Sequence, residues 1–362
     1  MITEQLKAIV DEVGTMMSKF EGKTILISGA CGFLGSWFVG VFQHLNQNVF
    51  QQPCVVYAVD SFIATNKVNN IIKITDENIH FVSSNIANMH ITSKFDYIIH
   101  AAGVASPIYY RKYPIETMDG MVWGCKNLLE SASHYGVESI LVFSSSEIYG
   151  NPPPDIVPTP ETYNGNVSCI GPRSCYDESK RMEETLCSSY YRVFNIPVKW
   201  VRPFNVYGPG MRINDNRVVP KFIFAALEKR PITVHIPGVQ TRTFCYITDA
   251  MVGFFKTLLL GQNGEAYNIG YPGGEMSMIE LAEKVKNLFE KTVEVIQIPI
   301  PPEYPHDQAL RRCPELTKAK EHLGYDPKIN VDMGLELMLH WAKEALIDKG
   351  RFEKIGSMSS VV

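Results

Sequence analysis

A tyrosine and a lysine four residues apart, Tyr176 and Lys180 in C-Y-D-E-S-K, are the first residues with an evident chemical use. If this segment is helical, the two side chains lie on one face of the helix. An ammonium group beside a phenol favours the phenolate and should pull the pKa of Tyr176 toward neutrality. Such a tyrosine could accept a proton from an alcohol that is being oxidised. The same spacing also occurs by chance in structural helices, so its meaning depends on its surroundings.

Three hydroxyls and a carboxylate follow the apolar run I-L-V-F at 140–143, in the segment S-S-S-E-I-Y-G at 144–150. Open α/β sheets bind ligands at the carboxyl ends of their strands. We therefore expect Ser145 and Glu147 to lie in the same site as Tyr176. The alternative is a simple turn cap, with Glu147 in solvent.

A glycine pattern after the first apolar run indicates a dinucleotide site. Gly29, Gly32 and Gly35 have the G-x-x-G-x-x-G spacing that lets a backbone turn approach a pyrophosphate at a helix N-terminus. Asp60 ends the second apolar run, where a carboxylate can bind the ribose hydroxyls and would repel a 2′-phosphate. The pattern therefore predicts NAD, in preference to NADP, as the cofactor.

The elements that must position these residues alternate along the chain. Short apolar runs are separated by stretches of helical periodicity, which is typical of a parallel sheet covered on both faces. We predict strands at 23–28, 54–60, 79–83, 97–100, 140–144 and 198–201. We predict helices after the glycine segment 29–35 through about residue 45 and near 115–135, 174–194, 218–229, 277–290 and 333–346. The fold class is α/β, a doubly wound parallel (Rossmann) sheet with a smaller mixed α/β substrate lobe. A Pro-rich segment at 151–160 is either a rigid linker or a wall of the site.

Three units are predicted. Residues 21–208 form the dinucleotide-binding domain and residues 209–362 the smaller lobe. Residues 1–20 repeat apolar side chains every three or four positions, which indicates an amphipathic helix. We expect this helix to pack on the body or on a second subunit, in preference to a membrane.

Composition excludes several other classes of protein. The net charge of −4 and the pI near 6.2 give no basic field for nucleic acid, and no uncharged stretch is long enough for a membrane span. The eight cysteines show neither C-x-x-C spacing nor a metal-ligand cluster, so we expect no metal and a reduced, cytoplasmic setting.

Residues 23–345 together resemble an extended short-chain dehydrogenase/reductase of the nucleotide-sugar type, the group of 4-epimerases, 4,6-dehydratases and UDP-glucuronate decarboxylases. The pair Ser146-Glu147 stands where similar dehydratases have Asp-Glu, and it resembles the pair of the decarboxylases. Three further segments also resemble the decarboxylases: G-P-R-S-C-Y-D-E-S-K-R at 171–181, the segment 212–223, and Q-T-R-T-F-C-Y-I at 240–247. The resemblance implies oxidation of a UDP-glucuronate-like sugar at C4, loss of CO2 from the β-keto acid, and re-reduction.

The resemblance also implies roles for individual residues. It makes Ser145 the hydroxyl partner of the tyrosine and places Arg242 near the sugar carboxylate, although Arg242 alone could equally be a phosphate ligand or a surface ion pair. The implied catalytic residues are Ser145, Glu147, Tyr176, Lys180 and Arg242. The implied substrate contacts are Ser146, Arg173, Asn205, Arg217, Arg242 and Arg312. The implied cofactor contacts are Gly29, Gly32, Phe33, Leu34, Gly35, Asp60, Asn85, Ile86, Ala101, Ala102, Gly103, Tyr176, Lys180 and Pro203.

Three positions depart from the family pattern. Met121 replaces an asparagine, Gly103 a serine, and Asn85 an aspartate that often contacts adenine. Two alternatives therefore stay open, a 4-epimerase or dehydratase for another nucleotide sugar and a non-catalytic NAD sensor. Similar enzymes form homodimers through two long helices, which here would be those near 115–135 and 174–194.

Overall fold

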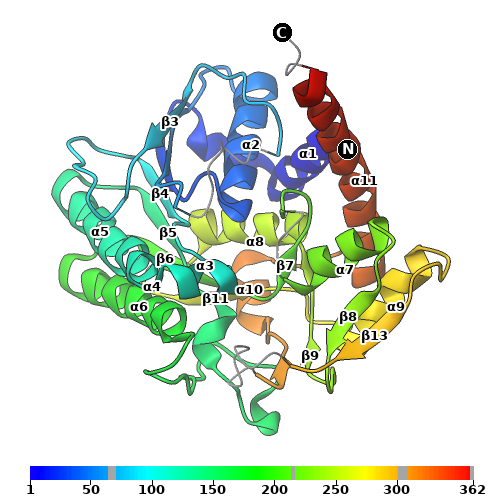
Figure 1. Cartoon of the computed structure of the whole chain (residues 1–362). Helices are drawn as coiled ribbons and strands as arrows, with labels where there is room; N and C mark the ends of the chain where they lie inside the picture. The colour runs from blue at the N-terminus through cyan, green and yellow to red at the C-terminus, as the bar shows by residue number, and fades with distance from the viewer. Residues whose placement is uncertain (64–70, 213–216, 301–308, 359–362) are drawn as a thin grey trace.

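A seven-stranded sheet forms the centre of the molecule, with the strand order β11-β6-β5-β4-β1-β2-β3 and every pair parallel. The computed structural model describes residues 1–63, 71–212, 217–300 and 309–358 (Figure 1). The strands of this sheet are β1 (Thr24–Ser28), β2 (Val55–Asp60), β3 (Ile79–Ser83), β4 (Tyr97–His100), β5 (Ser139–Phe143), β6 (Val198–Pro203) and β11 (Ala266–Ile269). The order reverses beside β1, as in a doubly wound sheet, which confirms the predicted fold class.

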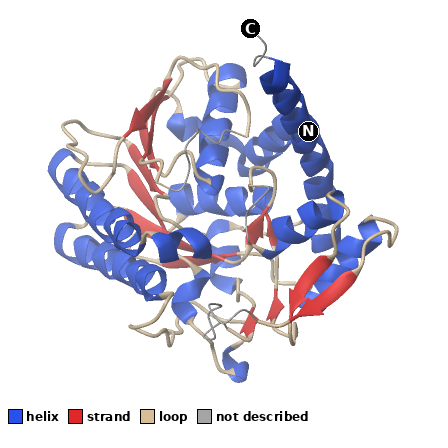
Figure 2. Ribbon diagram, in the orientation of Figure 1, coloured by secondary structure: helices blue, strands red, loops and turns tan. Residues whose placement is uncertain are grey.

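Helices cover both faces of the sheet because successive residues of a strand point to opposite sides. In β1, Ile25 and Ile27 face one buried core and Leu26 faces the other. The first core is closed by α1, α2 and α8, and the second by α5 and α6, which lie side by side in Figure 1. Figure 2 shows the strands lying between these helices. The bounds are α1 (Ile2–Val13), α2 (Phe33–Asn48), α5 (Gly124–Tyr135), α6 (Ser174–Phe194) and α8 (Ile247–Leu260).

The predicted N-terminal helix packs on the body of the protein. Helix α1 runs from Ile2 to Val13 and continues as a 3-10 helix over Gly14–Phe20. Leu6 and Ile9 are fully buried against α8 and α2, and the amide of Gln5 donates to the Tyr246 hydroxyl at 3.1 Å. The apolar face of this helix therefore packs into the first core.

The predicted helix near 115–135 contains an irregular turn. It consists of α4 (Pro114–Met118), a π-helical turn (Asp119–Trp123) and α5. At the end of the wide turn, a Cβ on Gly124 would lie 2.6 Å from Ile86 Cγ2 and 3.3 Å from His100 Cε1. A glycine is required there for the helix to approach the sheet closely.

The C-terminal part of the chain builds the smaller lobe and also returns to the main sheet. Its pieces are α7 (Val218–Leu227), β8 (Ile232–His235), β9 (Thr241–Arg242), β12 (Met276–Ser277), α9 (Met278–Leu288), β13 (Val295–Ile298), β14 (Arg311–Arg312), α10 (Thr317–Leu323) and α11 (Val331–Met358). Two short strands, β7 (Val206–Tyr207) and β10 (Cys245–Tyr246), pair near the junction. Earlier in the chain lie the short helix α3 (Pro107–Lys112) and two 3-10 turns, Ser146–Tyr149 and Pro154–Ile156. Because β11 pairs with β6, the predicted boundary at 208–209 stays a prediction.

The Pro-rich segment joins these two parts of the molecule. The backbone N–H of Thr159 donates to Cys313 O at 2.9 Å, and the side chain of Asn268 donates to Thr159 O at 2.9 Å.

In the described part of the chain, no helix combines the length and apolar character that a bilayer crossing requires.

Candidate active site

A pocket of about 510 Å³ opens at the carboxyl ends of β1, β2 and β4. Eight of the predicted cofactor residues line it: Gly29, Gly32, Asp60, Asn85, Ile86, Ala101, Ala102 and Gly103. Gly29 has a φ of +73°, and a Cβ on Gly35 would lie 2.1 Å from Gly29 O, so this turn can be built only from glycine. The N–H groups of Gly29 and Ala30 donate to Val59 O, and that of Gly32 donates to Gly29 O, so these bonds hold the turn itself in shape. A pyrophosphate would instead face the first turn of α2, whose N-terminus favours an anion, and this fits a dinucleotide.

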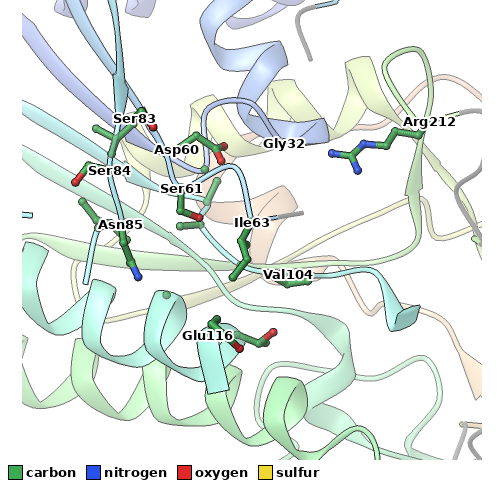
Figure 3. Close-up of a pocket in the computed structure, with 18 residues that line it drawn as sticks. Gly32, Asp60, Ser61, Ile63, Ser83, Ser84, Asn85, Val104, Glu116 and Arg212 are labelled. Carbon is green, nitrogen blue, oxygen red and sulfur yellow. The ribbon is translucent and has the colours of Figure 1, made fainter. Parts of the chain in front are cut away.

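Asp60 is fixed in the wall of this pocket by two backbone groups. Its Oδ2 accepts from the N–H of Cys31 at 2.9 Å, and its Oδ1 accepts from the N–H of Phe62 at 2.8 Å. A carboxylate has about four acceptor positions, so both oxygens can still accept ribose hydroxyls. Figure 3 shows Asp60 beside Gly32, at the edge of the glycine turn. The arrangement fits the predicted NAD site.

Six polar residues that line the pocket were not predicted: Ser61, Ser83, Ser84, Glu116, Thr117 and Arg212. Ser61 and Ser84 directly follow β2 and β3, so the rule that placed Asp60 could have found them. Glu116 comes from α4, and Arg212 reaches in from the loop after β7, opposite Asn85 in Figure 3. No local pattern marks these two, because only the tertiary fold brings their segments to the pocket.

The remaining predicted cofactor residues lie outside the lining of this pocket. Phe33, Leu34 and Gly35 form the first turn of α2, and Pro203 ends β6. Lys180 is connected to the pocket through Gly103, because a Cβ at Gly103 would lie 3.3 Å from Lys180 Nζ. The contacts of these residues with NAD stay a prediction.

Tyr176, Lys180 and Ser145 come together at the end of β5. Tyr176 and Lys180 lie in the first turns of α6, and the ammonium of Lys180 is 5.9 Å from the Tyr176 ring centre. The ammonium also donates to Phe143 O at 2.6 Å, which ties α6 to the end of the strand. The Ser145 hydroxyl is within hydrogen-bonding reach of the Tyr176 phenol and accepts from the N–H of Glu147 at 3.1 Å. Ser145 is therefore both a turn cap and a partner of the tyrosine.

The expected lowering of the tyrosine pKa is not found. Burial raises the pKa of Tyr176, and the opposing effects of Lys180 and Ser145 leave it above its ordinary value. The prediction was wrong in sign because it considered the neighbouring ammonium and left out the loss of water around the phenol.

Glu147 lies among three guanidinium groups. It forms ion pairs with Arg173 and, at 3.2 Å, with Arg312 Nη2. Burial acts to raise the pKa of Glu147, but Arg312, Arg173 and Arg242 together hold it below its usual value. The carboxylate is therefore ionised at neutral pH. The alternative interpretation, a carboxylate left in solvent, does not hold.

Two further side chains of this cluster were not predicted. Asp177 contacts Arg173 Nε at 3.2 Å, and burial raises the pKa of Asp177 to about 6. Tyr110 from α3 stacks on Tyr176 with ring centres 5.5 Å apart, and its buried hydroxyl has no hydrogen-bond partner among the described residues. Asp177 stands in the Y-D-E-S-K motif itself, whereas Tyr110 is brought to the site by the loop after β4.

Residues 25–270, more than half of the chain, match the NAD dependent epimerase/dehydratase family. The chain belongs to this family. UDP-glucuronic acid decarboxylase 5 of Arabidopsis thaliana is 40% identical over 314 residues, which are 87% of each chain. A solved epimerase of Methanothermobacter thermautotrophicus superposes with a TM-score of 0.78 at 24% identity and covers 94% of this chain and 97% of that one. A UDP-glucose 4-epimerase of Thermotoga maritima, solved with UDP-glucose, has a TM-score of 0.76 at 26% identity over 89% and 99%.

Membership of an NAD dependent epimerase/dehydratase family confirms the predicted resemblance, the enzyme class and NAD as the cofactor. The residues that would hold NAD are the glycine turn and Asp60. The family name does not assign roles to single side chains, so the catalytic and substrate residues stay predictions.

The predicted substrate residues of this family member lie around Glu147 and along the junction with the smaller lobe. Arg312 donates to Ser146 O and, at 3.0 Å, to Gly150 O, and its side chain is buried. Asn205 donates to Thr243 O at 2.9 Å. The Arg242 guanidinium donates to Ala309 O and Thr241 O, each at 2.8 Å. Arg217 directly precedes α7, and its guanidinium lies over the ring of Phe33 at 5.4 Å. Of the predicted segment 212–223, residues 213–216 lie outside the described residues.

Proposed function

We propose that this chain is an NAD-dependent UDP-glucuronate decarboxylase. The observation that carries the proposal is the charge around Glu147, where three arginines face one ionised carboxylate beside Tyr176 and Ser145. Relatives named UDP-glucuronic acid decarboxylase support it, at 40% identity in Arabidopsis thaliana and 34% in Xenopus tropicalis.

The excess of positive charge suits a substrate that carries a carboxylate. Arg173, Arg312 and Arg242 supply three positive charges, and Glu147 with an ionised Asp177 supplies two negative charges at most. Asp177, with its pKa at about 6, is partly protonated near neutral pH, which increases the excess. Guanidinium groups bind carboxylates and phosphates through paired, charge-assisted hydrogen bonds. A neutral sugar ring would not use this excess, which would then be available only to the diphosphate of the nucleotide.

Tyr176 would handle the proton of the C4 hydroxyl. Bound NAD would supply a reversible hydride acceptor at C4 and a positive charge beside the phenol. As that hydroxyl is oxidised, Tyr176 accepts its proton, with Lys180 stabilising the phenolate and Ser145 donating to the C4 oxygen. Tyr176 returns the same proton when the ketone is reduced.

Oxidation at C4 places the C6 carboxylate β to a ketone. The C5–C6 bond then breaks, CO2 leaves, and the electron pair becomes an enolate on the C4 oxygen. Hydrogen bonds from Ser145 and protonated Tyr176 would stabilise this oxyanion. A proton taken up from solvent is added to C5, and we assign Glu147 and Arg242 to positioning its donor.

We further propose a homodimer formed through α5, α6 and the turn before them. Exposed apolar side chains on these elements support it: Trp123, Tyr135, Met182, Val193 and Phe194. Met182 and Val193 are eleven residues apart, about three helical turns, and therefore lie on one face of α6.

All eight cysteines are without disulfides, which supports a reducing, cytoplasmic setting.

The decisive experiment incubates the purified protein with UDP-glucuronate and NAD and resolves the nucleotide sugars by mass. A product lighter by one CO2, lost in Glu147→Ala and in Tyr176→Phe, is the expected result. A product of unchanged mass with a new configuration would instead identify a 4-epimerase. NAD binding without turnover of UDP-glucuronate would reject the decarboxylase proposal for this substrate.

A further inference from the structure

A carboxylate with no solvent contact lies directly beside the predicted catalytic lysine. Glu183 Oε2 is 2.8 Å from Lys180 Nζ, and the side chain of Glu183 is fully buried. Lys180 Nζ also donates to Phe143 O at 2.6 Å. The contact with Phe143 O is a hydrogen bond, whereas Glu183 is held as an ion pair, because neither of its carboxylate oxygens has a hydrogen-bond partner among the described residues. The Lys180 ammonium also lies 5.9 Å from the centre of the Tyr176 ring. Glu183 therefore fixes one side of a group on which the proposed chemistry depends.

His100, the last residue of β4, holds the other oxygen of this carboxylate. His100 Nε2 lies 3.2 Å from Glu183 Oε1 and 3.4 Å from Met121 O, and Nδ1 lies 2.7 Å from Ser28 Oγ. The carboxylate and the carbonyl can only accept, so we assign the hydrogen to Nε2. Nδ1 then accepts from the hydroxyl of Ser28, which directly precedes the glycine turn. A continuous buried network thus connects the cofactor turn to Lys180.

The other titratable groups that face this network are two thiols and a carboxylate that belongs to a separate ion pair. Cys125 and Cys187 lie with their Sγ atoms 3.9 Å apart, and burial raises the pKa of Cys187 well above its usual value. Glu184 is bound to Arg202 at 2.6 Å. In the described part of the chain, Glu183 is the carboxylate that balances the charge of Lys180.

A buried ion pair of this kind is a poor way to gain stability. Two apolar side chains of similar volume would stabilise a core at least as well, but loss of one partner leaves an uncompensated buried charge. Burial alone would lower the pKa of Lys180, and Glu183, followed by Tyr176, raises it above its ordinary value. Glu183 thus keeps the lysine protonated where it has no access to water.

We infer that Glu183, oriented by His100, is a positioning residue that holds Lys180 charged and directed at Tyr176. The inference rests on the proposed catalytic role of the Tyr176–Lys180 pair. It assigns a function to a buried carboxylate that the mechanism above does not use.

The test compares the pH profiles of decarboxylation for the wild type and for Glu183→Gln. Without its counterion the buried Lys180 should lose its proton at a lower pH. The ratio of wild-type to variant kcat should then rise by about tenfold for each pH unit above that point. Glu178→Gln is the matched control, because it removes a carboxylate from the same helix that is paired with Arg181 at 3.6 Å and partly exposed. A ratio that is constant with pH, or equal activities, would overturn the inference.

A second readout needs no substrate and separates failure of this inference from failure of the proposed function. The phenolate absorbance of Tyr176 is obtained as the difference between each protein and its Tyr176→Phe counterpart. We expect Tyr176 to ionise at a higher pH in Glu183→Gln than in the wild type, because the neighbouring lysine has become neutral. A titration that is unchanged overturns the role of Glu183, whatever the enzyme turns over.

A double substitution covers the case in which Glu183→Gln does not fold. Lys180→Met leaves the Glu183 carboxylate buried without its ammonium, so adding Glu183→Gln to that variant should raise its thermal midpoint. A double variant that is no more stable than Lys180→Met would show that the two charges are not coupled, and would overturn the inference.

Discussion

The methyl group of Met121 lies next to the position that a side chain on Gly103 would occupy. A Cβ at Gly103 would be 2.8 Å from Met121 Cε, closer than real Cβ contacts. In the family pattern, position 103 has the larger residue serine and position 121 has the smaller residue asparagine. The two departures from the family pattern are therefore one compensated change in packing, beside Lys180.

We expect Gly103→Ser alone to disturb this packing. The added side chain must push Met121 or Lys180 aside, at a cost of about 1–3 kcal/mol in unfolding free energy and with weaker NAD binding. Gly103→Ser combined with Met121→Asn should recover most of both losses. Thermal unfolding and NAD titration of the two single variants and the double variant measure the coupling. Strictly additive losses would contradict the compensation.

Glu147→Gln should lower kcat by about 10²- to 10⁴-fold. The substitution keeps the shape of the side chain but removes the charge that Arg173 and Arg312 hold in place. Because the folded pKa of Glu147 lies below the ordinary 4.5, its ion pairs stabilise the fold above that pH and are lost as the pH falls further. The steady-state kcat profile should therefore show no break from Glu147 above pH 4.5. Glu275→Gln, which breaks the Arg311 pair at 2.7 Å, is the control and should retain activity.

Ionisation of Asp177 should lower the stability of the fold, whereas ionisation of Glu147 raises it. Its folded pKa is raised from 3.8 to about 6, so its ionisation destabilises the fold progressively between those values. Asp177→Asn removes this penalty. Relative to the wild type, the variant should gain on the order of 2–3 kcal/mol in unfolding free energy between pH 4 and pH 7. Denaturant unfolding at both pH values measures the gain, and a difference that does not change with pH would argue against a raised pKa.

The N-terminal helix should behave as part of the core. Ile9→Ala removes a side chain that is fully buried against α8 and α2, and should lower the unfolding free energy by about 2–5 kcal/mol. Lys7→Ala on the exposed face of the same helix should change it by about 0.5 kcal/mol or less. Urea unfolding of both variants is the measurement. Equal effects would mean that α1 is not anchored as the structure places it.

Trp123→Glu should disrupt the proposed homodimer. Trp123 is 55% exposed in the single chain, and a buried indole at an interface commonly carries a large share of the binding energy. Ile170→Glu changes a residue that is 81% exposed outside the proposed interface and should leave the assembly unaltered. Sedimentation velocity distinguishes the two. A wild type that sediments as a monomer would reject the dimer itself.

Local patterns were enough for much of the framework. The structure has β3 at Ile79–Ser83, β4 at Tyr97–His100 and α6 at Ser174–Phe194, as the apolar runs and helical spacing predict. These elements are specified by periodicity and by the residues at their ends, which act over a few positions. The predicted helix near 115–135 was less accurate, because its π turn depends on how Gly124 meets the sheet.

The sign of the Tyr176 pKa shift shows where sequence reasoning ends. The spacing of Tyr176 and Lys180 placed the ammonium near the phenol, but burial has the larger effect and is not readable from spacing. Glu183 is a similar case. Glu183 stands three residues from Lys180 in the sequence, but its effect on the charge of Lys180 depends on its complete burial beside His100.

The sequence by itself determined the doubly wound sheet, the glycine turn with Asp60, and the pairing of Tyr176 with Lys180. Each of these depends on residues close together in the chain, or on the rule that parallel strands end at one edge. Only the tertiary structure decided that Glu147 meets Arg312, that Met121 fills the space beside Gly103, and that Glu183 is sealed against Lys180. The physical reason is that charge balance and packing depend on burial, which arises only when distant segments have folded together.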